Sequence, residues 1–294
     1  MQLATKTKRL AALGAAAAST TLAAALVTAP TAQAADATVA WAPAGSAAIT
    51  PGVQTNTAGS GQCTANFVFS DAAGGVYLGQ AAHCASTGEA TDTDGCVAAS
   101  LPLGTRVTFN RGGSLLSAGE QVGAGTLVYS SWVTMQSRGE TDADTCAYND
   151  FALVKVDAGD VSKVNPSIPF WGGPSGINTS GTAAGDRVHS FGNSGIRAGI
   201  EQLSPKTGVS LGADGGGWTH PVYTVTPGVP GDSGSAFVDG QGKALGTLST
   251  LALAPLPASN GVGDLGRELA YAQQHGTISG LALAQGTEPF SPVL

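Results

Sequence analysis

The stretch "GVPGDSGSAF", residues 228–237, places three glycines and a proline around Asp232 and Ser233. Glycine permits positive φ and close backbone approach, whereas proline fixes φ and removes a backbone donor. These residues predict a rigid turn that presents the Ser233 hydroxyl beside bare backbone N–H groups, an arrangement that can hold an attacking oxygen next to an anion-binding hollow. An ordinary surface turn has the same composition. The rest of the chain therefore has to decide between the two interpretations.

The composition indicates an all-β protein with its own core. Charged residues make up 11% of the 294-residue chain, the net charge is −7, and the 13 basic residues form no cluster. Nucleic-acid binding needs Lys and Arg gathered on one face, so that partner is excluded. Short apolar runs separated by Gly, Asn, Asp and Ser favour a sandwich or a pair of barrels. One helix is predicted in "DLGRELAYAQQH", with Asp264 as its N-cap and Gly276 just past its end.

The N-terminal segment has the features of a secretory signal peptide. A basic head is followed by an uncharged stretch, 10–30, rich in Ala, Leu, Thr and Val. Ala32 and Ala34 then fit an A-x-A cleavage signal. We therefore expect residues 1–34 to be removed, and the mature protein to be secreted, extracellular and free of the membrane.

Four cysteines, an even number in a chain expected to be exported, suggest two disulfides, for which three pairings exist. "CTANFVF" and "VYLGQAAHC" read as strands on either side of the turn signal "SDAAGG", and such a hairpin places Cys63 opposite Cys84. The remaining pair is then Cys96–Cys146. A metal site is the weaker alternative, because the chain has no C-x-x-C pair and no histidine cluster beyond His83. No metal or cofactor motif is present.

Three residues together have the chemistry of a nucleophilic serine site. His83 ends a strand-like run in "AAHC", Asp150 begins another in "NDFALVKV", and Ser233 lies in the glycine-rich turn. Each residue alone has an ordinary structural explanation, as a packed or surface histidine, a strand-entrance aspartate and a turn serine. Together they supply a base that titrates near neutral pH, a carboxylate to orient it, and a nucleophile. The N–H groups of Gly231 and Ser233 would meet the developing oxyanion.

The order His, Asp, Ser, with "AAHC", "NDFALVKV" and "GDSGSAF", closely resembles the chymotrypsin-like (trypsin-fold) serine proteases, in particular their bacterial secreted members. The resemblance covers roughly residues 60–275. It implies an all-β fold of two packed antiparallel six-stranded barrels with a C-terminal helix. The protease domain would span 61–294, with the two halves meeting near 160–180, and 35–60 would be an N-terminal arm or a short pro-segment.

The resemblance also assigns roles to residues. It implies a secreted serine endopeptidase, without a cofactor, that acts on peptide or protein substrates through an acyl-enzyme, with His83, Asp150 and Ser233 as its triad. Ser249, in "GTLS", would donate a hydrogen bond to the Asp150 carboxylate. The cysteine beside the histidine matches the family's disulfide near the base. We expect a monomer.

The specificity pocket departs from the common family patterns. Its base lies six residues before the nucleophile, at Pro227, which carries no charge. On the opposite wall, Thr250 and Leu251 stand where "SxG" is frequent in the family. The resemblance therefore implies a small or partly blocked, uncharged pocket, and a preference for small or uncharged side chains before the cut bond.

The route of activation also differs from that of trypsin zymogens, because no Lys or Arg occurs between Arg9 and Arg106. In those relatives a new N-terminal amine pairs with the aspartate before the nucleophile, here Asp232. Resemblance to bacterial members implies that an internal cation replaces the amine. In "DRVHSFG" we expect Arg187 or His189, which share one face of a strand. The alternative is an N-terminus processed at an unrecognised site.

Two other functions compete with the endopeptidase. The first is a non-catalytic secreted binding protein on the same fold, which Leu251 mildly favours because it narrows the pocket. The second is an esterase, but its strand–turn–helix setting around G-x-S-x-G is not matched here. The intact set of three residues favours the enzyme.

Overall fold

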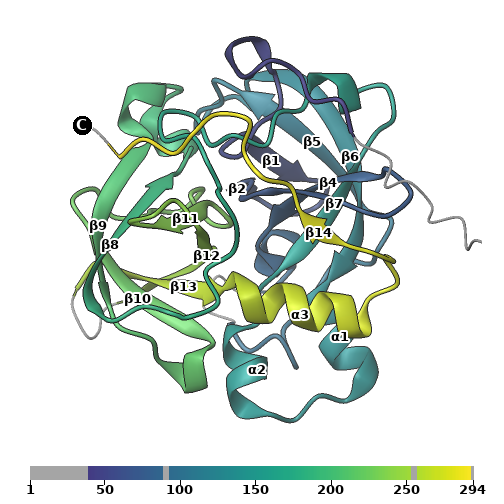
Figure 1. Ribbon diagram of the computed structural model, residues 1–294. Helices are drawn as coiled ribbons and strands as arrows, with labels where there is room; N and C mark the ends of the chain where they lie inside the picture. The colour runs from purple at the N-terminus through teal and green to yellow at the C-terminus, as the bar shows by residue number, and fades with distance from the viewer. Residues whose placement is uncertain (1–38, 89–92, 253–256, 293–294) are drawn as a thin grey trace, which may run out of the picture. The chain divides into compact units, whose positions relative to one another are not determined.

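The strands of the protein form two separate sheets in the computed structural model, which describes residues 39–88, 93–252 and 257–292 (Figure 1). The predicted signal peptide, 1–34, lies outside the described residues. Among the residues described, no helix is long and apolar enough to cross a membrane.

The first sheet has eight antiparallel strands in the order β14-β3-β4-β7-β6-β5-β1-β2. All but β14 come from residues 54–156. β14 returns from the C-terminal segment and adds to β3, where Leu283 pairs with Phe69. The strands are β1 (Gln54–Thr57), β2 (Gln62–Thr64), β3 (Val68–Ser70), β4 (Val76–Gln80), β5 (Arg106–Arg111), β6 (Glu120–Ser130), β7 (Ala152–Val156) and β14 (Ala282–Leu283).

β1 falls within the range 35–60 that the sequence assigned to an arm or pro-segment. The strand lies inside the first sheet, between β2 and β5, and its residues Gln54, Thr55 and Thr57 are buried. These polar side chains give no apolar signal, although backbone pairing on both sides makes this segment part of the sheet.

The second sheet is a closed barrel in the order β10-β13-β12-β11-β8-β9. The predicted all-β class with a C-terminal helix is confirmed, and the second half is the expected six-stranded barrel. The first half differs in strand number, because the short strands β2 and β14 extend it to eight. The barrel strands are β8 (Ala184–Phe191), β9 (Pro205–Leu211), β10 (Thr219–Thr224), β11 (Ala236–Asp239), β12 (Ala244–Ala252) and β13 (Ser259–Asp264).

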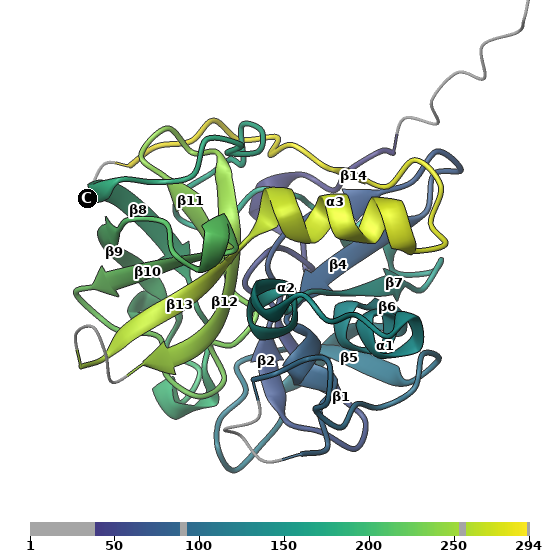
Figure 2. The ribbon, with the colours of Figure 1, turned by 90° about the horizontal axis from the view of Figure 1, so that it is seen from below.

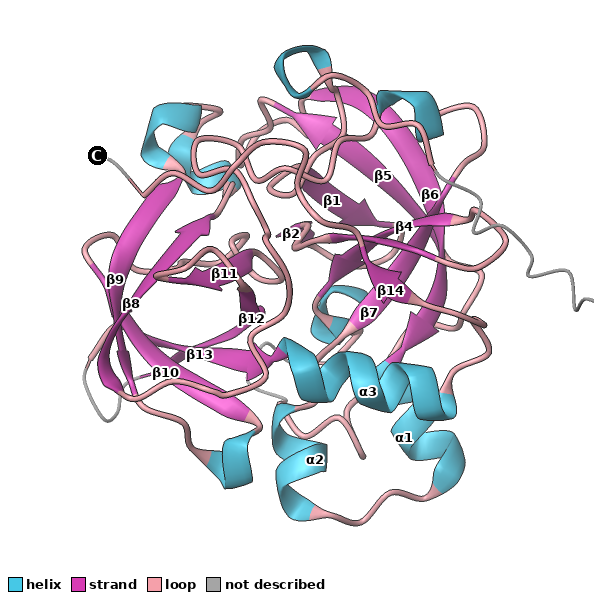
Figure 3. Cartoon of the chain, in the orientation of Figure 1, coloured by secondary structure: helices cyan, strands magenta, loops and turns pink. Residues whose placement is uncertain are grey.

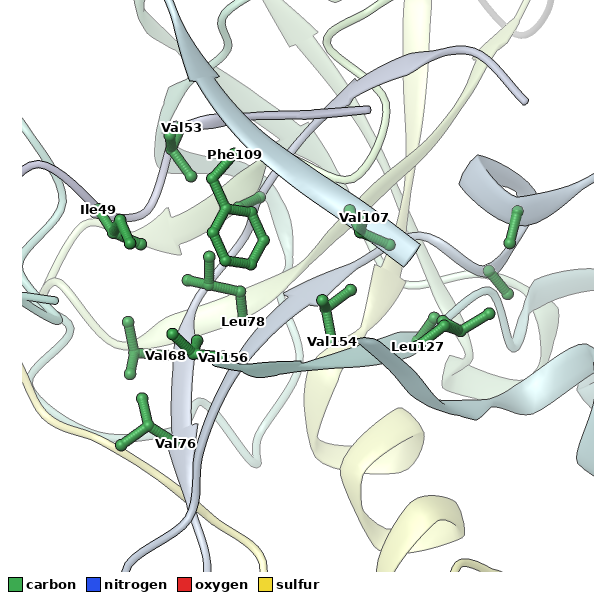
Figure 4. Packing of buried hydrophobic residues seen from close by; sticks show 14 of the residues in the cluster. Ile49, Val53, Val68, Val76, Leu78, Val107, Phe109, Leu127, Val154 and Val156 are labelled. Atoms are coloured by element: carbon green, nitrogen blue, oxygen red, sulfur yellow. The ribbon is translucent and has the colours of Figure 1, made fainter. Parts of the chain in front are cut away.

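Successive side chains of β4 point into two different hydrophobic clusters. Val76 and Leu78 point into the cluster of the first sheet, together with Val154 of β7 (Figure 4). Tyr77, between them, joins a second cluster on the other face. Side chains alternate across a strand, so a segment covered on both faces is apolar at successive positions, as Val76–Leu78 of β4 is. Burying each such side chain stabilises the fold by about 1.5–3 kcal/mol.

The described residues contain three α-helices, of which the sequence predicted one (Figures 2 and 3). α3 (Leu265–His275) confirms that prediction, and its N-cap, the Asp264 carboxylate, accepts a hydrogen bond from the Arg267 backbone N–H at 2.8 Å. The others are α1 (Ser131–Arg138) and α2 (Ala143–Tyr148). α1 lies in "TLVYSSWVTM", which reads as a strand throughout. β6 ends at Ser130, however, and the Ser130 hydroxyl caps the new helix.

Candidate active site

Two neighbouring strands bring His83 next to Asp150. β4 and β7 pair antiparallel, so the end of β4 lies beside the start of β7. His83 follows β4 in a single 3₁₀ turn, η2 (Ala82–Ala85), and Asp150 comes directly before Phe151 and β7. His83 Nδ1 lies 2.6 Å from Asp150 Oδ2, and the His83 backbone N–H donates to Asp150 Oδ1 at 2.8 Å. These two bonds orient the ring and direct Nε2 away from the carboxylate.

The electrostatics of this pair make the charged form of His83 more stable than it would be in a buried histidine without a carboxylate partner. Burial opposes charge on His83, but the negative charge of Asp150 and their hydrogen bond outweigh it and raise the pKa of His83 above 6.5, its usual value. Burial also works against the Asp150 carboxylate. The charge of His83 and hydrogen bonds from His83 and Ser249 more than offset this and lower the pKa of Asp150. Asp150 therefore stays ionised and stabilises an imidazolium.

Ser249 reaches the same carboxylate from the barrel. Its hydroxyl donates to Asp150 Oδ2 at 2.5 Å. Ser249 lies where the register between β12 and β13 shifts, between Leu248 and Thr250, so it has no partner residue on β13. Such a bulge redirects a side chain. Here the residue at the bulge is Ser249, whose hydroxyl reaches Asp150. The structure thus contains the Ser249–Asp150 contact that the resemblance implied.

The turn around Ser233 uses two glycines for steric reasons. Gly231 has φ +94° and Gly234 has φ +86°, values in the left-handed region. A Cβ on Gly231 would lie 2.5 Å from Gln62 Oε1, and one on Gly234 would lie 2.6 Å from the Thr64 carbonyl oxygen. The turn is further fixed because the Ser233 carbonyl accepts from the Thr64 backbone N–H at 2.8 Å. Only glycine fits both positions without strain.

The turn leaves two backbone donors free. Within the described ranges, the N–H groups of Gly231 and Ser233 have no hydrogen-bond acceptor, whereas the N–H groups of Asp232, Gly234 and Ser235 all donate to carbonyl oxygens. Two free N–H groups, one of the serine itself and one two residues before it, form the kind of preorganised donor pair that stabilises an oxyanion.

One cavity of about 560 Å³ is lined by the candidate triad, His83, Asp150 and Ser233, by Gly231 of the predicted oxyanion site and by Ser249. No hydrogen bond joins the Ser233 hydroxyl to His83 among the described residues, and such catalytic bonds are often long until substrate binds. The structure therefore places the candidate base, its carboxylate partner and the candidate nucleophile around one cavity, without a hydrogen bond between His83 and the Ser233 hydroxyl.

The wall of the cavity differs in part from the predicted specificity pocket. Thr250 and Leu251 line it, but Pro227 is not among the lining residues. The Pro227 carbonyl accepts from the buried Lys206 ammonium at 3.3 Å, and Lys206 does not line the cavity either. Lining residues that the sequence did not single out include Gly228, Val229 and Asn260.

Asn260 fixes the two walls of this pocket relative to each other. Its Oδ1 accepts from the Gly228 N–H at 2.8 Å, and its Nδ2 donates to the carbonyls of Gly228 and Thr250, each at 3.2 Å. One buried amide thus joins the segment before the nucleophile to β12. A lone asparagine in a strand carries no local signal for such a role, so sequence reasoning missed it.

Both predicted disulfide pairs are present. Cys63–Cys84 connects β2 to η2, the turn that carries His83, and Cys96–Cys146 connects a loop to α2. The first pair therefore restrains the chain next to the candidate base.

The carboxylate of Asp232 is fully buried and paired with two cations. Arg197 donates to both of its oxygens, with Nη2 2.6 Å from Oδ2. Lys206 Nζ lies 3.2 Å from Oδ2, and the Lys206 side chain is also fully buried. Backbone N–H groups of Ser194 and Val229 complete the shell at 3.0 and 3.1 Å. Burial and the neighbouring Arg197 lower the pKa of Lys206, whereas Asp232 opposes that shift.

This arrangement corrects the expected partners of Asp232. Arg187 on β8 is exposed, and His189 packs between the rings of Trp171 and Phe290. Neither side chain pairs with Asp232, because strand β8 directs them elsewhere. The cation is internal, as the hypothesis required, but it comes from η4 (Gly195–Arg197), a turn after β8, and from β9.

No protein-family model matches the chain, and no curated protein matches its sequence. Solved structures similar to it include Thermobifida fusca Protease A, at 16% identity and a TM-score of 0.47, over 81% of this chain and 99% of that one. Nocardiopsis Protease is similar at 18% identity and a TM-score of 0.44, over 80% and 98%. Cellulomonas bogoriensis chymotrypsin is similar at 17% identity and a TM-score of 0.45, over 80% and 98%.

Proposed function

We propose that this protein is a serine endopeptidase in which Ser233 is the nucleophile, His83 the general base and Asp150 the residue that orients His83. One observation carries the proposal: the hydrogen-bonded His83–Asp150 pair lines the same cavity as Ser233 and the free N–H groups beside it. An ordinary surface turn has no reason to face such a pair.

In the proposed reaction, His83 Nε2 takes the proton from the Ser233 hydroxyl while Oγ attacks the carbonyl carbon of the scissile bond. The carbonyl oxygen becomes an oxyanion that accepts from the N–H groups of Gly231 and Ser233. The imidazolium then gives its proton to the leaving amine, and the C–N bond breaks to leave an acyl-enzyme. Water, deprotonated by His83, cleaves the ester and restores Ser233. Removing one oxyanion donor typically costs about 2.7–4 kcal/mol of transition-state stabilisation.

A fluorophosphonate probe tests this function directly, because an activated serine displaces fluoride and keeps the phosphonyl group. We expect the folded wild-type protein to be labelled and Ser233→Ala to remain unlabelled. Ser235→Ala is the matched control, since Ser235 lies in the same turn, is buried and does not line the cavity; this variant should still be labelled. A folded wild-type protein that takes up no probe would instead support a non-catalytic binding protein.

The value of kcat/KM should rise with pH through the ionisation of His83, with its midpoint above pH 6.5. Only the neutral imidazole accepts a proton, and the charge of Asp150 outweighs burial and raises the pKa of His83, so activity is lost as pH falls through that raised value. The measurement is a pH profile with an uncharged peptide. His275→Gln, which alters a partly exposed histidine at the end of α3, should leave the midpoint unchanged. A rate that is constant from about pH 5 to 8, with chemistry limiting, contradicts His83 as the base.

The side chain preferred before the cut bond should be small or moderate and uncharged, because the cavity wall that includes Val229, Leu248 and Leu251 offers no charge. Leu251→Ala, which removes a half-exposed side chain from this wall, should extend cleavage to larger apolar residues. A peptide-library profile measures both effects. Val209→Ala on β9, outside the cavity, is the control. A wild-type profile dominated by Arg, Lys or Glu rules out this pocket.

We further propose that the protein is secreted and acts as a monomer on extracellular peptides or proteins. Two disulfides support the location, since they persist in oxidising compartments. The buried Arg197–Asp232 pair supports an enzyme that does not need a trypsin-like activating cut, because the carboxylate already has its cation.

A further inference from the structure

Glu268 is a fully buried carboxyl group that the proposed reaction does not use. It lies on the first turn of α3, and its Oε2 accepts from the Thr247 hydroxyl at 2.8 Å. Its Oε1 has no hydrogen-bond partner among the described residues. This oxygen is pressed against Gly263 of β13, where any Cβ would collide with it. An isolated buried carboxyl is expensive, so its presence calls for a specific role.

Contacts lead from Glu268 to the candidate triad. Thr247 accepts a hydrogen bond from the Asn66 side chain at 3.2 Å, so its hydroxyl hydrogen is directed to Glu268. Two residues further along β12, across the bulge, Ser249 donates to Asp150. Glu268 therefore fixes Thr247 on β12, two residues before Ser249, whose hydroxyl donates to the Asp150 carboxylate.

The groups that face Glu268 keep it neutral. Asp150, Asp264 at the start of α3, and the Tyr129 hydroxyl on β6 all interact with it, and none of these carries positive charge. No lysine, arginine or histidine in the described ranges pairs with it. Burial, followed by the charges of Asp150 and Asp264, raises the pKa of Glu268 well above its usual value, against the opposing effects of the Thr247 hydrogen bond and the nearby Asp150 backbone. An ionised Glu268 would add a second buried negative charge beside Asp150.

We propose that Glu268 is a positioning residue for the active site: through Thr247 it holds β12 in the register that brings Ser249 to Asp150. The proposal rests on the proposed function, because Asp150 matters only if His83 acts as a base. Glu268 touches no reacting atom, and it acts as a neutral acid that receives the Thr247 hydrogen bond.

The test compares Thr247→Val, Thr247→Ser and Glu268→Gln with the wild type. Two quantities are measured: the pKa of the His83 imidazole by NMR titration, and kcat and KM for peptide cleavage. Thr247→Val keeps the shape but removes the hydroxyl, so Asp150 is held less firmly. We expect the His83 pKa to fall and kcat to drop roughly tenfold with KM nearly unchanged. Thr247→Ser and Glu268→Gln keep the hydrogen bond between positions 247 and 268. Both variants should therefore have the wild-type His83 pKa, kcat and KM.

Two results overturn the proposal. If Thr247→Val leaves both the His83 pKa and kcat unchanged in a folded protein, the Thr247–Glu268 hydrogen bond does not position the active site. If Glu268→Gln lowers the His83 pKa, Glu268 carries a charge in the native protein. The NMR titration needs no turnover, so a protein that fails to label with the fluorophosphonate probe would refute the proposed function while the role of Glu268 is still decided separately.

Discussion

Ser233→Ala and His83→Ala should each lower kcat for peptide hydrolysis by about 10⁶-fold, and the double variant should lose little more. The reason is that the nucleophile and the base act as a unit: without either, the proton cannot leave Oγ as the bond forms. Binding through the cavity wall and the N–H groups of Gly231 and Ser233 remains, so KM should change far less than kcat. Steady-state kinetics on purified variants measure both constants.

His220→Asn tests whether the loss at His83 is specific. His220 is also buried and hydrogen-bonded to a carboxylate, Asp264 Oδ2 at 2.9 Å, but it lies in the barrel and does not line the cavity. Its replacement should affect the free energy of unfolding more than kcat. Losses at Ser233 and His83 that multiply in the double variant would show that the two residues act independently, contrary to the proposed mechanism.

Arg197→Met should destabilise the protein by about 3–5 kcal/mol and abolish most of its activity. The change removes the bidentate partner of a fully buried carboxylate and leaves Asp232 with Lys206 alone, at 3.2 Å. Asp232 also holds the Val229 N–H, so the turn that presents the two free N–H groups loses its support. Urea unfolding gives the free energy, and kcat/KM reports the turn.

Arg106→Met is the matched control, since Arg106 also pairs with an aspartate, Asp157, at 2.6 Å. Both side chains of that pair are about half exposed, so its removal should cost at most about 1 kcal/mol. Equal effects of the two arginine variants would contradict the assignment of Arg197 as the internal cation. Lys206→Met should destabilise less than Arg197→Met, because the contacts that it breaks are longer, at 3.2–3.4 Å, and because it relieves repulsion between two neighbouring cations.

The candidate triad could be predicted from the sequence because each of its residues lies in a short motif that is recognisable without knowledge of distant contacts. His83 and Asp150 end and begin apolar runs, and Ser233 lies among glycines that the turn requires. The partners of Asp232 could not be found in this way. Arg197 reaches it from a turn 35 residues earlier, and only the path of the chain in three dimensions distinguishes Arg197 from the equally basic Arg187.

Asn260 and Glu268 were missed for the same reason, since each acts through contacts between separate elements. The helix α1 was missed for a different one. Val133 and Thr134 are β-branched and favour a strand, but the Ser130 cap and packing of Trp132 and Met135 in the core override that preference. The two-residue strand β14 is too short to produce any periodic signal.

The pairing of β14 with β3 has a consequence for the order in which the protein becomes complete during synthesis. β3 and β4 emerge from the ribosome early, but β14, the partner of β3 at 282–283, emerges more than 200 residues later. Until then β3 is an open edge, which can pair with other chains. α3, which carries Glu268, also emerges late. Both β14, which completes the first sheet, and α3, which carries Glu268, are therefore synthesised after all three residues of the candidate triad.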